Sequence, residues 1–109
     1  VYSSRSRSLL DAVYDWSRFG SLPRAYNWIR EEMRRNPRIA NQIVNAAVKY
    51  GNTGSIRRLG RLLEDEGTSE RALNKLAAEL PATTAYIPWC PTRAKRGEID
   101  RGWGVVVNA

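Results

Sequence analysis

The strongest constraint on the fold is an alternation of amphipathic stretches and helix-breaking residues that runs from Ser4 to Pro81. Within each stretch, apolar residues recur three and four positions apart, which places them on one face of an α-helix. The stretches are separated by serine, threonine or asparagine residues, which cap helices, and by glycine or proline, which end or begin them. The pattern predicts five helices, at about residues 4–17, 22–36, 37–50, 55–66 and 69–80.

The break between the third and fourth helices can be predicted in more detail. Its residues, 51–55, are glycine, asparagine, threonine, glycine and serine. We expect Gly51 to take the left-handed conformation that often follows a helix, because glycine adopts it without steric cost. Thr53 or Ser55 would then cap the fourth helix.

After Pro81 the composition changes from helix-forming to strand-forming residues. Residues 83–87 and 103–107 are rich in aromatic and β-branched side chains, as strands are. They predict an antiparallel pair of strands joined by a long basic loop at 91–97. The fold class is therefore α+β and mostly helical, with about five helices packed on a small antiparallel sheet. We expect residues 1–109 to form a single domain, whose marginal two-stranded sheet could be completed by strands upstream of Val1.

The chain is strongly basic, with 18 lysine and arginine residues against 11 acidic residues and a net charge of +7. Such an excess favours an anionic partner, nucleic acid above all. The alternative is that the charge serves only solubility. No stretch approaches the roughly 20 apolar residues of a membrane span. Because the chain has a single cysteine, Cys90, which fits a reducing compartment, we expect a cytoplasmic protein.

Catalytic and metal sites lack their usual residues in this sequence. There is no histidine and only one cysteine, so a Ser-His-Asp triad, a Cys-His pair and the common zinc sites cannot be assembled. The acidic run at 64–66 points in different directions around a helix and is expected to lie in solvent. We therefore expect no enzymatic activity, no cofactor and no bound metal.

The fourth helix, at 55–66, is the most informative. Its apolar residues form one arc, whereas Arg57, Arg58 and Arg61 fan across the opposite side as one patch. These arginines come before the acidic residues of the same helix, which is the reverse of the order that the helix dipole favours. An unfavourable order of charges with no compensation visible in the sequence indicates either that the patch binds a partner or that its arginines pair with residues elsewhere in the fold.

Two interpretations of the basic residues are open. In the first, the arginines of the fourth helix and the basic residues of the loop at 91–97 bind nucleic acid or an acidic partner. In the second, Arg58 or Arg61 is partly buried and pairs with Asp65 or with acids of another helix. The basic residues of the loop are Arg93, Lys95 and Arg96.

Other residues of this region are predicted from their positions in the pattern. Leu59 and Leu63 lie in the apolar arc and are expected to be buried. Gly60 lies beside the arc and costs about 1 kcal/mol of helix stability relative to alanine, which predicts a close crossing by another helix. Trp89 and Trp103 bracket the basic loop, where they could stack on bases or, alternatively, anchor the core.

Four segments together resemble, in order and spacing, the C-terminal domains of AbiEi-type antitoxins. Residues 6–11 are similar to an element near the start of those domains. Residues 50–64 are similar to a block in which tyrosine usually stands where this chain has Arg61. The match continues through residues 86–91, Gly97 and residues 103–108, so that it touches nearly the whole chain.

The resemblance implies an antitoxin and transcriptional regulator of the abortive-infection type. In that family a winged-helix N-terminal domain binds operator DNA, and this chain offers no place for it. The C-terminal domain would support antitoxicity against a nucleotidyltransferase-like toxin and contribute to repression. Direct toxin binding and self-association remain open, since such antitoxins can act without a stable complex. The charge by itself supports a second function, a stand-alone basic RNA- or DNA-binding module, and an enzyme fragment completed by another domain is the third alternative.

Overall fold

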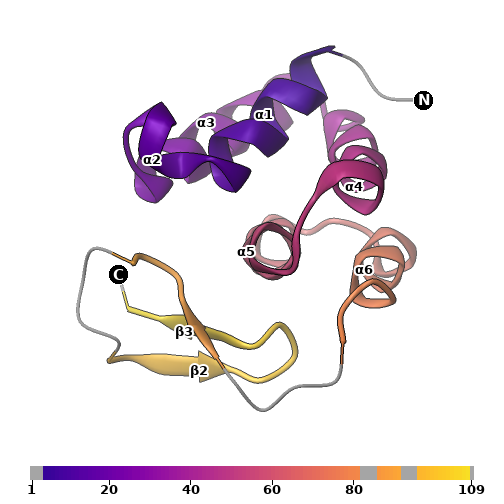
Figure 1. The fold of residues 1–109 in the computed structure, drawn as a ribbon. Coiled ribbons are helices and arrows are strands. Elements are labelled where there is room, and N and C mark those ends of the chain that lie inside the picture. The colour runs from indigo at the N-terminus through magenta and orange to yellow at the C-terminus, as the bar shows by residue number, and fades with distance from the viewer. Residues whose placement is uncertain (1–3, 82–85, 92–95, 109) are drawn as a thin grey trace.

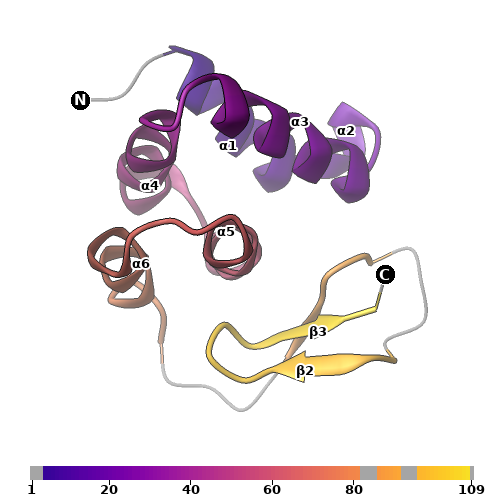
Figure 2. The same ribbon diagram turned by 180° about the vertical axis from the view of Figure 1, so that it is seen from behind.

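The computed structural model describes residues 4–81, 86–91 and 96–108, and the structural statements below concern these residues. They form six helices and three short strands (Figure 1, Figure 2). The helices are α1 (Ser4–Tyr14), α2 (Trp16–Phe19), α3 (Leu22–Arg35), α4 (Ile39–Tyr50), α5 (Thr53–Asp65) and α6 (Glu70–Ala77). The strands are β1 (Ile87–Pro88), β2 (Glu98–Asp100) and β3 (Val105–Val107). The fold is α+β and mostly helical, as the sequence predicts.

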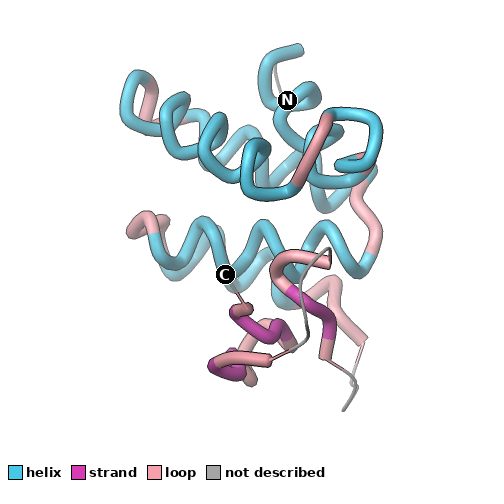
Figure 3. The backbone as a smooth tube through the Cα atoms, turned by 90° about the vertical axis from the view of Figure 1, so that its left-hand side faces the viewer, coloured by secondary structure: helices cyan, strands magenta, loops and turns pink. Residues whose placement is uncertain are grey.

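Helix α5 is the central element. It contacts α1, α4 and α6, and it also contacts β3. The N-terminal helices and the sheet lie on opposite sides of α5 (Figure 1, Figure 3). Leu59, Leu62 and Leu63 of α5 are 0% exposed, which confirms the predicted burial of the first and the last of them. None of the described helices is both long enough and apolar enough to span a bilayer.

The first helix predicted from the sequence is two helices in the structure, which raises the number from five to six. The chain leaves the helical conformation at Asp15, whose φ is −120° and ψ is 51°. Aspartate favours such positions because its short polar side chain competes for nearby hydrogen bonds. Its carboxylate lies 3.6 Å from the guanidinium of Arg18 in the next helix. Apolar periodicity continues across this break, so the pattern alone does not reveal it.

The start of α5 differs from the prediction in its cap. Asn52, and not Thr53 or Ser55, caps the helix by accepting a hydrogen bond from the backbone of Ser55. The Ser55 hydroxyl accepts one from the backbone of Asn52 in return, which makes a capping box. Gly51 has a φ of −74° and is not left-handed. Glycine is needed there for space, because a Cβ would lie 2.6 Å from the carbonyl oxygen of Ala47.

The sheet differs from the predicted antiparallel pair. Its strand order is β1-β3-β2, with β1 parallel to β3 and β2 antiparallel to it. Ile87 pairs with Val105, so the two segments predicted to be antiparallel run in the same direction. Residues 83–85 of the predicted strand lie outside the described residues. The antiparallel partner, β2, contains one apolar residue between two acids, a composition that strands usually avoid and that gave no signal.

An aromatic pair fixes the segment after β1 to the helices. The rings of Tyr26 on α3 and Trp89 are stacked, with centroids 3.8 Å apart. The Tyr26 hydroxyl donates a hydrogen bond of 2.8 Å to the Trp89 carbonyl oxygen. Trp89 and Trp103 are only 7% and 6% exposed. Their burial bears out the alternative in which these tryptophans anchor the core.

We expect Tyr26→Phe to lose about 1 kcal/mol of stability at neutral pH, because a buried hydrogen bond disappears. Burial raises the pKa of the Tyr26 hydroxyl, although the nearby Arg58 opposes this effect. In the unfolded chain a tyrosine ionises near pH 10, so above about pH 10 deprotonation stabilises the unfolded state of the wild type. Wild-type stability should therefore fall as the pH rises past that value, and the difference between wild type and variant should shrink. Urea unfolding at neutral and alkaline pH measures both; an unchanged difference would contradict the assignment.

Candidate nucleic-acid interface

The three arginines of α5 that the sequence predicts as an exposed patch face the sheet. The side of α5 opposite its apolar arc is covered by β3 and its neighbouring residues, because the sheet docks there (Figure 1). Arg57 is 5% exposed. Its guanidinium lies against the backbone of Gly104, where a Cβ would be 3.4 Å from the guanidinium carbon. Arg57 is therefore part of the packing between helix and sheet, and it is not on an open surface.

Arg58 joins α5 to β1. Its Nε and one terminal nitrogen donate hydrogen bonds of 3.1 and 2.9 Å to the carbonyl oxygen of Pro88. Burial lowers the pKa of the Arg58 guanidinium, with smaller opposing effects from Tyr26 and Cys90. A guanidinium that donates two bonds to one backbone oxygen holds that strand in place. Fewer of its donors remain for an external ligand.

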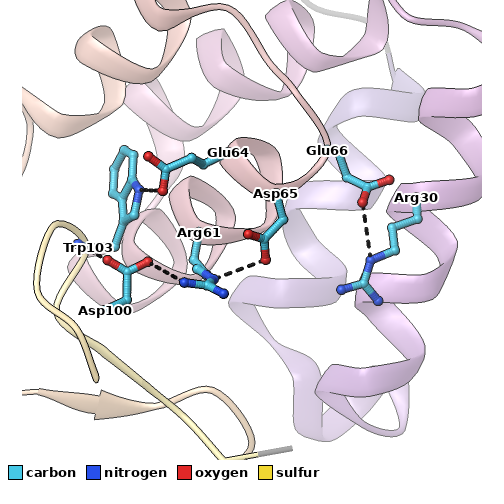
Figure 4. Close-up of polar contacts among 7 residues, drawn as sticks. All are labelled: Arg30, Arg61, Glu64, Asp65, Glu66, Asp100 and Trp103. Carbon is cyan, nitrogen blue, oxygen red and sulfur yellow. Dashed lines mark hydrogen bonds and ion pairs between the residues drawn. The ribbon is translucent and has the colours of Figure 1, made fainter. Parts of the chain in front are cut away.

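Arg61 joins α5 to β2 through two ion pairs (Figure 4). It lies 3.0 Å from the carboxylate of Asp65, one turn along the helix, and 3.0 Å from that of Asp100. The hydrogen bond to Asp100 raises the pKa of Arg61, against the smaller effect of burial. The ion-pair interpretation thus describes Arg61, except that its second partner comes from a strand and not from another helix.

The acids at the end of α5 are exposed, as expected, and they also have partners within the fold. Glu64 accepts a hydrogen bond of 3.2 Å from the indole nitrogen of Trp103, and Asp65 pairs with Arg61 (Figure 4). Glu66 lies 3.8 Å from Arg30 of α3. The unfavourable charge order along α5 is therefore offset by partners on the sheet and on α3. The order of charges along α5 thus has a structural explanation and does not require an external anion.

At Gly60, α5 closely approaches the turn between β2 and β3. A Cβ added to it would lie 2.2 Å from an atom of the Trp103 ring, well inside van der Waals contact. The predicted crossing by another helix is wrong, because the element that crosses here is an aromatic ring from the turn between β2 and β3. Only a residue without a side chain leaves room for it. The sequence indicated a close contact at Gly60, but it did not indicate that Trp103 makes this contact.

The predicted basic loop is only partly described. Arg93 and Lys95 lie outside the described residues. Arg96 is exposed. Of the four predicted basic residues that the structure describes, Arg57, Arg58 and Arg61 attach the sheet to α5, and Arg96 is exposed.

We expect Arg61→Ala to lower the free energy of unfolding by about 1 to 3 kcal/mol, because the Asp100 carboxylate loses its charged donor. The side chain of Asp100 is only 10% exposed, so water replaces that donor poorly. Arg61→Lys should restore part of the loss, since an ammonium keeps the charge without the guanidinium fork. Oligonucleotide affinity should fall no further than in the exposed control Arg101→Ala. An Arg61→Ala protein of wild-type stability and reduced affinity would identify Arg61 as a nucleic-acid contact.

A basic groove that the sequence did not indicate lies between α4 and α6. Two adjoining cavities of about 420 and 290 Å³ share Asn41 and Ser69 in their walls. Arg34 lines the first cavity, and Arg71 and Lys75 line the second. We call the two cavities together the α4–α6 groove. Arg34 lies on α3, whereas Arg71 and Lys75 lie one turn apart on α6, so no local pattern could have grouped all three.

No protein-family model, curated protein or solved structure matches this chain. Among the described residues, no group of three or more cysteine, aspartate and glutamate side chains is placed to hold a metal ion. What the chain does must therefore be inferred from its own residues and their arrangement.

Proposed function

We propose that this chain is the C-terminal domain of an AbiEi-type antitoxin and transcriptional regulator. It counteracts a nucleotidyltransferase-like toxin and assists the repression of its own operon in the cytoplasm. Operator recognition belongs to a winged-helix domain of the full-length protein. The chain is not an enzyme and uses no cofactor.

The observation that supports this proposal is the meeting of the resembling segments in space. Gly60, from the segment at 50–64, lies beneath the ring of Trp103, which opens the segment at 103–108. Arg58 of the first segment donates to Pro88 of the segment at 86–91. Three segments that are distant in the sequence thus form one joint between α5 and the sheet. If the chain has the fold of this family, the segments that resemble it should pack on one another, and these three do.

The segments at 86–91 and 103–108 are also joined to each other. The backbone nitrogen of Cys90 donates a hydrogen bond of 2.8 Å to the side-chain oxygen of Asn108. The side-chain nitrogen of Asn108 donates one of 2.9 Å to the carbonyl oxygen of Cys90. An asparagine that satisfies both backbone groups of one residue works like an added strand pair. This accounts for an asparagine at the end of the final resembling segment.

The departure from the family pattern lies in the same joint. Arg61 stands where tyrosine is usual, and it bonds to Asp100 of β2. In this chain the position therefore attaches β2 to α5 through an ion pair. The joint is built from structural contacts, which leaves partner binding to the exposed surface.

Growth rescue tests the proposed function. The chain, alone and as part of the full-length protein, would be produced together with the nucleotidyltransferase-like toxin that the proposal requires its operon to encode. We expect toxin expression to arrest growth and the antitoxin to restore it. An unrelated basic protein of similar charge is the control. A folded, well-expressed full-length protein that fails to restore growth would overturn the proposal.

The second candidate function is a stand-alone basic RNA- or DNA-binding module. The net charge of +7 and the α4–α6 groove favour it. The two functions separate in the same assay. A module of this kind binds nucleic acid and leaves toxin-arrested growth unchanged.

A further inference from the structure

We infer that the α4–α6 groove binds the phosphate backbone of a single nucleic-acid strand. The inference rests on one part of the proposed function, namely that the domain binds nucleic acid. It moves the contact surface away from α5, where the sequence places it, to α3, α4 and α6.

The cations of the groove are available, in contrast to those of α5. Arg34 and Arg71 are exposed. In the part of the chain that the structure describes, no carboxylate lies within ion-pair distance of either side chain. Lys75 donates its hydrogen bond to a neutral partner, the side-chain oxygen of Asn45, and so keeps its charge uncompensated. Three cations thus line one groove.

One acid lines the groove, but its charge is already paired. Glu66 stands in the wall of the first cavity and lies 3.8 Å from the guanidinium of Arg30. Glu70, in the first turn of α6, lines a different cavity, next to Trp103. The balance of charge within the α4–α6 groove is therefore positive, which attracts an anion.

Neutral polar groups also line the groove, beside apolar residues such as Met33 and Val44. The amides of Asn41 and Asn45 lie along the groove and can donate hydrogen bonds to phosphate or sugar oxygens. Thr68 lines the first cavity as well as the one next to Trp103, and its hydroxyl is buried.

The beginnings of two helices also contribute. Pro37 and Ala40, at the start of α4, line the first cavity, and Ser69, the N-cap of α6, lines both. Backbone N–H groups at helix N-termini carry partial positive charge and suit phosphate. Added to the cationic side chains, these N–H groups make the groove suited to phosphate.

The concave shape indicates a single strand, and the lining indicates contacts without sequence preference. The groove is concave, whereas a duplex is bound by a protruding element or an extended surface. None of the described side chains that line it is aromatic, so there is no platform on which bases would stack. The contacts are thus to the backbone, and the affinity should depend strongly on salt.

The test is fluorescence anisotropy of the full chain with a labelled oligothymidylate over a series of salt concentrations. We expect Arg34→Ala/Arg71→Ala to weaken binding by roughly tenfold at low salt. The log–log salt slope should become shallower by about 1.4, since each phosphate of a single strand that a cation neutralises accounts for about 0.7. Arg34→Lys/Arg71→Lys should keep most of the slope. The matched control is Arg18→Ala/Arg101→Ala, which removes the same charge from exposed positions outside the groove, and circular dichroism checks that each variant is folded.

The possible outcomes test the groove and the proposed function separately. Equal losses of affinity in the groove variant and the charge-matched control would overturn the groove and leave the proposed function standing. Binding to duplex DNA alone would also overturn it, and so would equal competition by polyglutamate, which would indicate an acidic protein partner. A wild-type chain that binds no oligonucleotide would overturn both the groove and the nucleic-acid part of the proposed function, while growth rescue would still report on antitoxicity.

Discussion

Leu63→Ala should lower the free energy of unfolding by about 2 to 5 kcal/mol, the largest effect that we expect from a single truncation. Leu63 is 0% exposed and belongs to the helix that contacts both the other helices and the sheet. Removing its side chain leaves a cavity that the surrounding helices can fill only in part. At roughly 4 °C for each kcal/mol in a chain of this size, Tm should fall by at least about 8 °C.

The measurement is urea unfolding followed by circular dichroism, in which the midpoint should fall while the slope stays constant. Leu73→Ala is the matched control, because Leu73 is half-buried at the edge of the same core. We expect it to cost clearly less. Equal effects at the two positions, or none at Leu63, would mean that the position of α5 in the core is misassigned.

Gly60→Ala should destabilise the protein by about 2 kcal/mol, although alanine is the better helix former. The added Cβ would lie 2.2 Å from the Trp103 ring, so the ring and the turn that carries it must move. Overpacking of this kind costs about 1 to 3 kcal/mol or more, against about 1 kcal/mol gained from helix propensity. Because Trp103 would become more exposed, its fluorescence should shift to longer wavelength.

Gly54→Ala is the control, since it makes the same substitution in the same helix. A Cβ at Gly54 would meet its nearest neighbours at 3.7 Å, an ordinary contact. We expect this variant to be as stable as the wild type or more stable, by up to about 1 kcal/mol. If the two glycine variants behaved alike, the close approach of Trp103 to α5 would be contradicted.

The helices were predictable because their signals are local. Ser21, one of the serines between the amphipathic stretches, caps α3 and accepts a hydrogen bond from the backbone of Arg24, three residues away. Spacing and capping of this kind depend only on neighbours in the chain. The break at Asp15 was missed because it leaves the apolar spacing intact. The fold class followed from the same local signals.

The sheet could be predicted only in part, because strand pairing depends on distant residues. The strand propensity at 105–107 is visible in the sequence, whereas its direction relative to Ile87 is not. β2 was missed because Glu98 and Asp100 are poor strand formers. Asp100 is held there by Arg61, a contact across 39 positions that no local pattern encodes.

The candidate site failed to follow from the sequence for a related reason. Helical periodicity shows which side of α5 is apolar, but it does not show that a sheet covers the other side. An arginine on that side is read as exposed, although Arg57 is 5% exposed in the structure. The α4–α6 groove could not be predicted either, because it forms only when the helices pack. Arg34 and Arg71 look like ordinary surface residues until the packing of three helices brings them together.

The parallel pairing of β1 leaves the sheet poorly suited to aggregation. Ile87 and Trp89 direct their backbone N–H groups toward β3, so that Pro88 is the β1 residue whose backbone faces outward. Pro88 has no N–H, and its carbonyl oxygen already accepts from Arg58. The opposite edge, β2, places charged residues on both sides of Ile99. Another copy of the chain therefore finds little to extend at either of these edges.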